Sequence, residues 1–255
     1  MPLRPTAGQG SRTLIDPRPG EETAHSLYQW LMSRACGDPA DSHVLASPIA
    51  ARASEPDGDL ADLLGLDARA LDLVLEQWFP EAAPDWRETG CLKLALHAGA
   101  GSSFCCGHCG GKVGSDRASP LPRVTGGEVA GMEEECEDIR ALLLEHAAPQ
   151  RTQALCLASI LARTCLRANH LWEDLGLRDR GEVLELMRRN FPSLAALNAG
   201  GRMRWKKFFY RQLCKRAQID ICRSPNCGSC DEYPICFSPE QTERDQAAGL
   251  VWTRT

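Results

Sequence analysis

Apolar residues recur along much of the chain at intervals of three and four, the spacing of one face of an α-helix. The clearest example is one shared face in the segment 157–168, made of Leu157, Ile160, Leu161, Thr164, Cys165 and Ala168. No segment shows the sustained two-residue alternation, bounded by turn residues, that a half-buried strand requires. The pattern therefore predicts a mainly α fold.

An acidic run at residues 133–138 directly precedes the apolar positions Ile139, Leu142 and Leu143. Carboxylates stabilise the positive, N-terminal end of a helix. We therefore expect a helix whose first turn holds these acidic residues.

The chain also contains an internal similarity at an almost constant offset. The triplet Leu45-Ala46-Ser47 corresponds to Leu157-Ala158-Ser159 at an offset of 112 residues. The same offset relates Leu31 to Leu143, Ala35 to Ala147 and Phe79-Pro80 to Phe191-Pro192, and an offset of 111 relates Leu64-Gly65-Leu66 to Leu175-Gly176-Leu177. Glycine commonly ends a helix, and proline prevents a helix from continuing. We interpret the similarity as two repeated three-helix units that pack through their apolar faces about a pseudo-two-fold axis. Chance resemblance between Leu- and Ala-rich helices is the alternative.

Local composition suggests six regions. Residues 1–20 are rich in Pro, Gly and Arg and are expected to be disordered. Residues 21–97 and 132–200 form the two helical units, separated by a Gly- and Cys-rich insertion or linker at 98–131. Residues 201–237 combine a basic aromatic helix with a cysteine-rich, cluster-binding loop, and 238–255 form a flexible tail.

The overall composition indicates a soluble globular protein, since 43% of the 255 residues are apolar and 25% are charged. A net charge of -5 gives no global reason to expect a nucleic-acid partner. The N-terminal residues lack the apolar core of a signal peptide, and no apolar run approaches membrane length. We therefore expect a cytoplasmic protein, whose 13 cysteines remain reduced and are available as metal ligands.

Four cysteines near the C-terminus are the strongest candidate site. They are Cys222, Cys227, Cys230 and Cys236, in a C-x4-C-x2-C-x5-C pattern. Thiolates are soft ligands that select iron–sulfur clusters, zinc or copper(I). Four could hold a cuboidal cluster; three irons could instead take three thiolates and leave a corner for another metal. Structural zinc usually has two close ligand pairs, whereas only Cys227 and Cys230 are spaced as C-x2-C here.

A basic aromatic segment at residues 202–216 leads into this motif. It contains seven basic residues and no acidic one, and Trp205, Phe208, Phe209 and Leu213 recur at helical spacing. One interpretation is an amphipathic helix with a solvated charged face. The other is that its cations, among them Lys206, Lys207 and Arg211, offset the charge of a thiolate cluster or attract an oxyanion.

Several other residues have less specific patterns. Cys105, Cys106, His108 and Cys109 could bind a second metal or belong to a variable insertion, and no fourth ligand is evident near Cys106, His108 and Cys109. Cys214 could be a spare ligand or a small core residue. His170 and Asp174, one helical turn apart, could assist metal capture, although a capping or packed histidine is the simpler interpretation. The scattered Cys36, Cys91, Cys136, Cys156 and Cys165 are expected to be structural.

The basic segment from Arg204 to Cys214, followed by the four-cysteine motif, closely resembles the NifQ family. The likeness extends upstream through residues 170–177 and 190–192. This resemblance implies a non-enzymatic iron–sulfur protein that binds molybdenum in a Mo-Fe-S cluster of [4Fe-4S] or [3Fe-4S] type. It also implies molybdenum donation to the NifEN/NifH machinery that assembles the nitrogenase iron–molybdenum cofactor, with the four motif cysteines as ligands.

Two other classes of function stay open from the residues alone. One is a zinc-stabilised module in which the basic helix contacts nucleic acid or another protein. The other is an iron–sulfur electron carrier that never releases its metal. The residues show no nucleophile–base constellation or phosphate-binding glycine loop that would indicate an enzyme.

Overall fold

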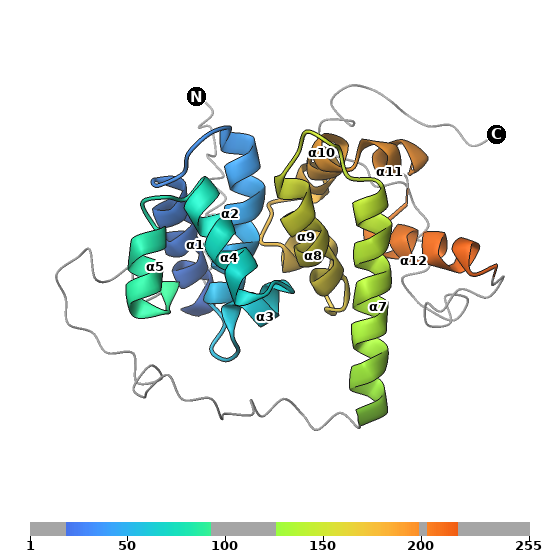
Figure 1. Ribbon diagram of the computed structural model, residues 1–255, viewed down its shortest axis with the longest axis horizontal. Coiled ribbons are helices and arrows are strands. Elements are labelled where there is room, and N and C mark those ends of the chain that lie inside the picture. The colour runs from blue at the N-terminus through green and yellow to red at the C-terminus, as the bar shows by residue number, and fades with distance from the viewer. Residues whose placement is uncertain (1–18, 93–125, 199–202, 219–255) are drawn as a thin grey trace, which may run out of the picture.

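The computed structural model describes residues 19–92, 126–198 and 203–218, and its regular secondary structure in these ranges is entirely helical. The prediction of a mainly α fold is therefore confirmed. Figure 1 shows α1 to α5 grouped on one side of the molecule and α7 to α12 on the other. The helices are α1 (Pro19–Met32), α2 (Pro39–Ala53), α3 (Leu60–Leu64), α4 (Ala68–Trp78), α5 (Ala83–Thr89), α7 (Gly126–Glu145), α8 (Gln153–Cys165), α9 (Leu171–Asp174), α10 (Arg180–Asn190), α11 (Pro192–Leu197) and α12 (Trp205–Arg216). No helix in the described ranges combines the length and apolar character needed to cross a membrane.

Aspartate side chains define where four of these helices begin. The carboxylates of Asp38, Asp59, Asp67 and Asp179 accept backbone N–H groups in the first turns of α2, α3, α4 and α10. Each carboxylate satisfies a donor that has no partner within the helix and contributes about 1 kcal/mol to its stability. The sequence thus specifies these helix starts locally.

The apolar faces of both groups of helices meet in a single core. On α8, Leu157, Ile160 and Leu161 are fully buried, and Thr164 and Cys165 are almost so, as the helical spacing predicted. The helix ends at Cys165, however, and Ala168 is exposed, so its assignment to this face was wrong.

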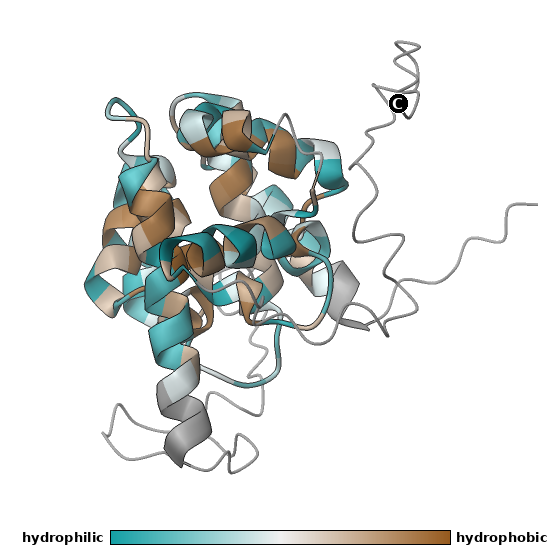
Figure 2. Ribbon diagram, turned by 90° about the vertical axis from the view of Figure 1, so that its right-hand side faces the viewer, coloured by the Kyte–Doolittle hydropathy of each residue, from teal (hydrophilic) through white to brown (hydrophobic). Residues whose placement is uncertain are grey.

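The start of α7 also differs from the expectation. The helix begins at Gly126, so the acidic residues 133–138 lie in its middle and not in its first turn. Side-chain pairs stabilise the acidic part instead: Arg140 binds Glu137 at 2.7 Å and Arg163 of α8 binds Glu133 at 3.2 Å. The helix therefore starts within the segment expected to be an insertion or linker. In Figure 2 the coloured part of α7 below the body is teal to white, so it is mainly hydrophilic.

The two groups of helices make matching backbone hydrogen bonds. The N–H of Cys36 donates to the carbonyl of Trp78 at 2.9 Å, and the N–H of Ala148 donates to that of Asn190 at 2.8 Å. Both donor and acceptor are displaced by 112 residues between the two bonds. In each group, therefore, the loop before the second helix is tied to the end of a later helix, α4 or α10.

Two glycines make matching contacts between the groups. Gly65 and Gly176 follow the short helices α3 and α9, and both have φ of +68°, a conformation that favours glycine. A Cβ at Gly65 would lie 3.0 Å from the carbonyl oxygen of Ser159, and one at Gly176 would lie 3.0 Å from that of Ser47. Each group therefore brings a glycine backbone into close contact with a long helix of the other.

Candidate metal centre and the helix that precedes it

The four predicted ligands, Cys222, Cys227, Cys230 and Cys236, lie outside the described residues, as do Cys105, Cys106, His108 and Cys109. The nearest described element is α12, and the residues described after it extend to Gln218, four positions before Cys222. Within the described ranges, no group of three or more His, Cys, Asp or Glu side chains is arranged to hold a metal ion. The structure therefore describes the helix that precedes the candidate site, α12, and how this helix is attached to the body.

Helix α12 is attached to the body by its aromatic face. Trp205, Phe208 and Phe209 are 2%, 3% and 0% exposed, which confirms the predicted apolar face. Their rings form a cluster with centroid separations of 5.6 to 6.1 Å, in tilted and edge-to-face arrangements. Burial of three aromatic side chains at the start of α12 fixes this end of the helix against the core.

Lys206 adds a polar attachment next to this aromatic cluster. Its Nζ atom donates to the carbonyl oxygens of Arg167 and Asn169 at 2.8 and 2.6 Å, and to the Oδ2 atom of Asp174 at 2.8 Å. An ammonium group has three hydrogens, so these acceptors match its full capacity. Lys206 therefore binds the connection between α8 and α9, and its charge is compensated within the protein by the carboxylate of Asp174.

Asp174 is the centre of the polar network that receives Lys206. Its side chain is 3% exposed and also accepts from the Nδ2 atom of Asn169 at 3.1 Å, with the Nε atom of Arg167 at 3.7 Å. Its backbone carbonyl accepts from Arg52 of α2 at 2.7 Å. Burial lowers the pKa of Arg52, and nearby Glu55 opposes that shift. The network thus connects α12 with α2 of the first group of helices.

His170 begins α9 as a capping residue. Its backbone N–H donates to the carboxylate of Glu173 at 2.9 Å, and its Nδ1 atom lies 3.3 Å from the Nη1 atom of Arg204. Asp174 is paired with Lys206 in the interior. These contacts favour a structural role for His170 and Asp174 over the metal-capture role considered from sequence.

Tyr210 lies one helical turn after Lys206 on α12 and anchors the helix to Glu135 of α7. Burial raises the pKa of its hydroxyl, and a hydrogen bond with Glu135 raises it further. Tyr210 is therefore protonated at neutral pH and donates to the Glu135 carboxylate.

The cysteines in the described ranges differ in how readily they can form thiolates. Burial raises the pKa of Cys136 and Cys156, and raises that of the more deeply buried Cys165 to about 12. A thiol must lose its proton to bind a metal, so these three are poor ligands. Cys214 is 9% exposed and lies on α12, whereas Cys36 is exposed.

Sequence reasoning missed Lys206 and Asp174 as an attachment point. Lys206 was grouped with the cations of the basic face, because its partners lie 32 to 39 residues earlier in the chain. Spacing within α12 carries no information about those partners.

Comparison with known proteins identifies the region that contains α12 and the motif. Residues 115–238 match the family model described as NifQ, a range that includes α7 to α12 and all four motif cysteines. The chain is 45% identical over 107 residues to Protein NifQ of Azotobacter vinelandii, covering 42% of this chain and 54% of that protein. It is 51% identical over 82 residues to Protein NifQ of Klebsiella pneumoniae, covering 32% and 48%.

A third relative, Protein NifQ homolog of Sinorhizobium fredii, is 42% identical over 113 residues, which cover 44% of this chain and 49% of that protein. The chain spans about half the length of the curated relatives it matches. No solved structure matches it at a comparable level of significance. The matched region is a helical scaffold followed by a four-cysteine motif. Residues 115–238 are therefore similar in sequence to the NifQ family, as the basic segment and the four-cysteine motif indicated.

Proposed function

We propose that this chain is an iron–sulfur protein that binds molybdenum and donates it to the cytoplasmic NifEN/NifH machinery for assembly of the nitrogenase iron–molybdenum cofactor. The observation that carries this proposal is the match to the NifQ family over a range that contains all four motif cysteines. The protein acts as a carrier and performs no covalent catalysis of its own.

Cys222, Cys227, Cys230 and Cys236 would hold the cluster, because four thiolates suit iron–sulfur centres. When bound, the cluster supplies iron and sulfide positions to which molybdenum attaches as cargo. The described thiols of Cys136, Cys156 and Cys165 have raised pKa values, so they compete weakly for metal.

Some of the cations on α12 are already paired within the protein, which leaves fewer of them available to attract molybdenum or a partner. Lys206 is bound to the α8–α9 connection, and Arg216 forms an ion pair with Glu145 of α7 at 2.6 Å. Arg211 and Lys215 are exposed on the same helix. We assign to these two residues the attraction of a molybdenum oxyanion or an acidic partner surface.

The proposal is tested on full-length protein purified without oxygen. Iron, sulfide and molybdenum are measured per chain, and the protein is then mixed with NifEN and NifH to follow molybdenum transfer. Cys-to-Ser substitution at each motif position should lower the iron content, whereas Cys36→Ser, at an exposed thiol outside the motif, should not. Arg211→Gln with Lys215→Gln should lower molybdenum loading and leave iron unchanged.

Two results would replace the proposal with another class of function. A colourless protein with bound zinc would support the zinc-stabilised module. An iron–sulfur protein that never passes molybdenum to the assembly proteins would support the electron carrier.

We also propose that the helical body arose by duplication. The almost constant offset in sequence, the paired hydrogen bonds of Cys36 and Ala148, and the reciprocal contacts of Gly65 and Gly176 support this origin. The second unit then leads through α12 to the cysteine motif.

A further inference from the structure

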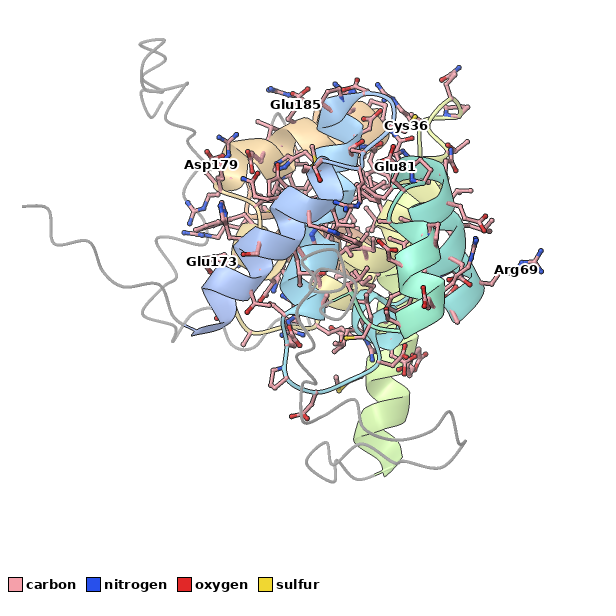
Figure 3. The ribbon with its side chains drawn as sticks, turned by 90° about the vertical axis from the view of Figure 1, so that its left-hand side faces the viewer. Cys36, Arg69, Glu81, Glu173, Asp179 and Glu185 are labelled. Atoms are coloured by element: carbon pink, nitrogen blue, oxygen red, sulfur yellow. The ribbon has the colours of Figure 1, made fainter. Side chains whose placement is uncertain are left out.

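A groove of about 450 Å³ lies between α2 and α10. Four residues of α2, from Ala40 to Val44, line one side, and ten residues between Arg178 and Asn190 line the other. The groove therefore lies between one helix of each group. In Figure 3, Asp179 and Glu185 mark the α10 side of this region, near the paired helices α1 and α2. Its volume is within the range of small-molecule sites, about 300–1,000 Å³.

Most charged groups around the groove are already paired with one another. The carboxylate of Asp41, 9% exposed, accepts from Arg189 at 2.9 Å and from Arg151 at 2.6 Å. Glu182 pairs with Arg178 and lies 3.3 Å from the Nε2 atom of His43. Since these charges are neutralised within the protein, the groove offers little net attraction to a strong anion or cation.

Two buried polar atoms on the α10 side lack a partner in the described part of the chain. Asn190 is 0% exposed and donates through Nδ2 to the carbonyl of Leu186 at 2.9 Å, but its Oδ1 atom accepts no hydrogen bond. The Nε–H group of Arg189 is likewise buried and without an acceptor. Buried groups of this kind are normally satisfied, so an unpaired acceptor and an unpaired donor on consecutive groove residues indicate a missing partner.

We propose that this groove binds a neutral ligand that carries an amide group on a short apolar stem. An amide carries both an N–H donor and a carbonyl acceptor, the two kinds of partner that Asn190 Oδ1 and Arg189 Nε–H lack. Val44, Leu184 and Leu186 line the groove and supply apolar surface for the stem. The proposal does not rely on the cysteine motif, so its failure would leave the metal-carrier proposal untouched.

Three probes with nearly the same alkyl stem test the class of ligand: hexanamide, hexanoate and hexylammonium. Each is titrated into the full-length, ¹⁵N-labelled protein, and amide shifts are followed by nuclear magnetic resonance. Hexanamide is expected to shift signals from residues 40–44 and 178–190, and to bind at least about fivefold more tightly than either charged probe. Equal binding of all three would show only an apolar groove, and stronger binding of a charged probe or no binding would also overturn the proposal.

Variants test the two hydrogen-bonding atoms separately. Asn190→Leu removes the acceptor at similar volume, and Arg189→Lys keeps a cation for Asp41 while removing the Nε–H donor. Each should weaken hexanamide binding about fivefold. Glu185→Gln, which removes an exposed charge at the rim, should leave hexanamide binding unchanged. If Asn190→Leu fails to fold, Arg189→Lys and the three-probe comparison decide the question. Unchanged affinity in Arg189→Lys would contradict the assigned geometry.

Discussion

Replacing Lys206 with methionine tests whether α12 is attached through a buried ion pair. Methionine keeps the length and apolar stem of lysine but removes all three hydrogen bonds to the α8–α9 connection. Asp174, only 3% exposed, would lose its closest cationic partner, since Arg167 lies farther away at 3.7 Å. Lys206→Met therefore leaves a buried carboxylate incompletely compensated.

The size of the effect follows from this loss. Removal of one partner of a buried ion pair typically costs about 3–5 kcal/mol. Asp174 keeps the hydrogen bond from Asn169 and the more distant charge of Arg167, so we expect the lower end, about 3 kcal/mol. Lys215→Met is the matched control, because Lys215 is exposed on the same helix and its loss should change stability by no more than about 0.5 kcal/mol.

Urea unfolding monitored by tryptophan fluorescence and by circular dichroism measures both variants. The double variant Lys206→Met with Asp174→Asn removes the uncompensated charge and should be more stable than Lys206→Met alone. If Lys206→Met loses less than about 1 kcal/mol, or behaves like Lys215→Met, the ion pair does not hold α12 in place.

Three further predictions concern the body of the protein. Gly65→Ala should lower the free energy of unfolding in urea by at least about 1 kcal/mol more than Gly37→Ala does. Both glycines have positive φ, but only at Gly65 would a Cβ lie against neighbouring atoms. Equal losses in the two variants would show that backbone conformation alone matters. Because the folded pKa of Cys165 is raised to about 12 from an ordinary 9.0, the unfolded chain loses that proton first, so stability is retained below pH 9 and falls as the pH rises towards 12. Cys165→Ala should flatten this decline in a pH series of thermal melts, and an unchanged slope would exclude the buried thiol as its cause. In the native protein at pH 8, iodoacetamide should modify the exposed Cys36 and spare Cys165, as mass spectrometry of the alkylated peptides can show.

Local patterns in the sequence were sufficient to predict much of the helical structure. The buried face of α8 and the aromatic face of α12 follow from residue spacing, because periodic burial depends on a helix's own sequence. The start of α7 was misplaced, since acidic residues are favourable in a first turn but are also stable in mid-helix when Arg140 and Arg163 pair with them. Charge pattern alone did not distinguish these cases.

The candidate site was predictable in chemistry and much less so in environment. The identities and spacing of Cys222, Cys227, Cys230 and Cys236 indicate a soft-metal site. This remains a prediction from sequence, because the motif lies outside the described residues. The role of Lys206 depends on a partner 32 residues earlier in the chain, and that of Asn190 on a buried oxygen that has no hydrogen-bond partner in the described residues. Such roles become visible only when the helices are placed in space.

The reciprocal glycine contacts have a genetic consequence. A side chain at Gly65 would approach Ser159 and the Cβ of Arg163, which belong to α8, whereas one at Gly176 would approach Ser47 and Ala51 of α2. A larger residue at either glycine would therefore clash with atoms in the other half of the chain. Second-site suppressors of a Gly65 substitution should arise at position 163, more than ninety residues away, and those of a Gly176 substitution at position 51, because these two neighbours contribute side-chain atoms that a smaller residue would remove. Each half constrains which mutations the other can tolerate.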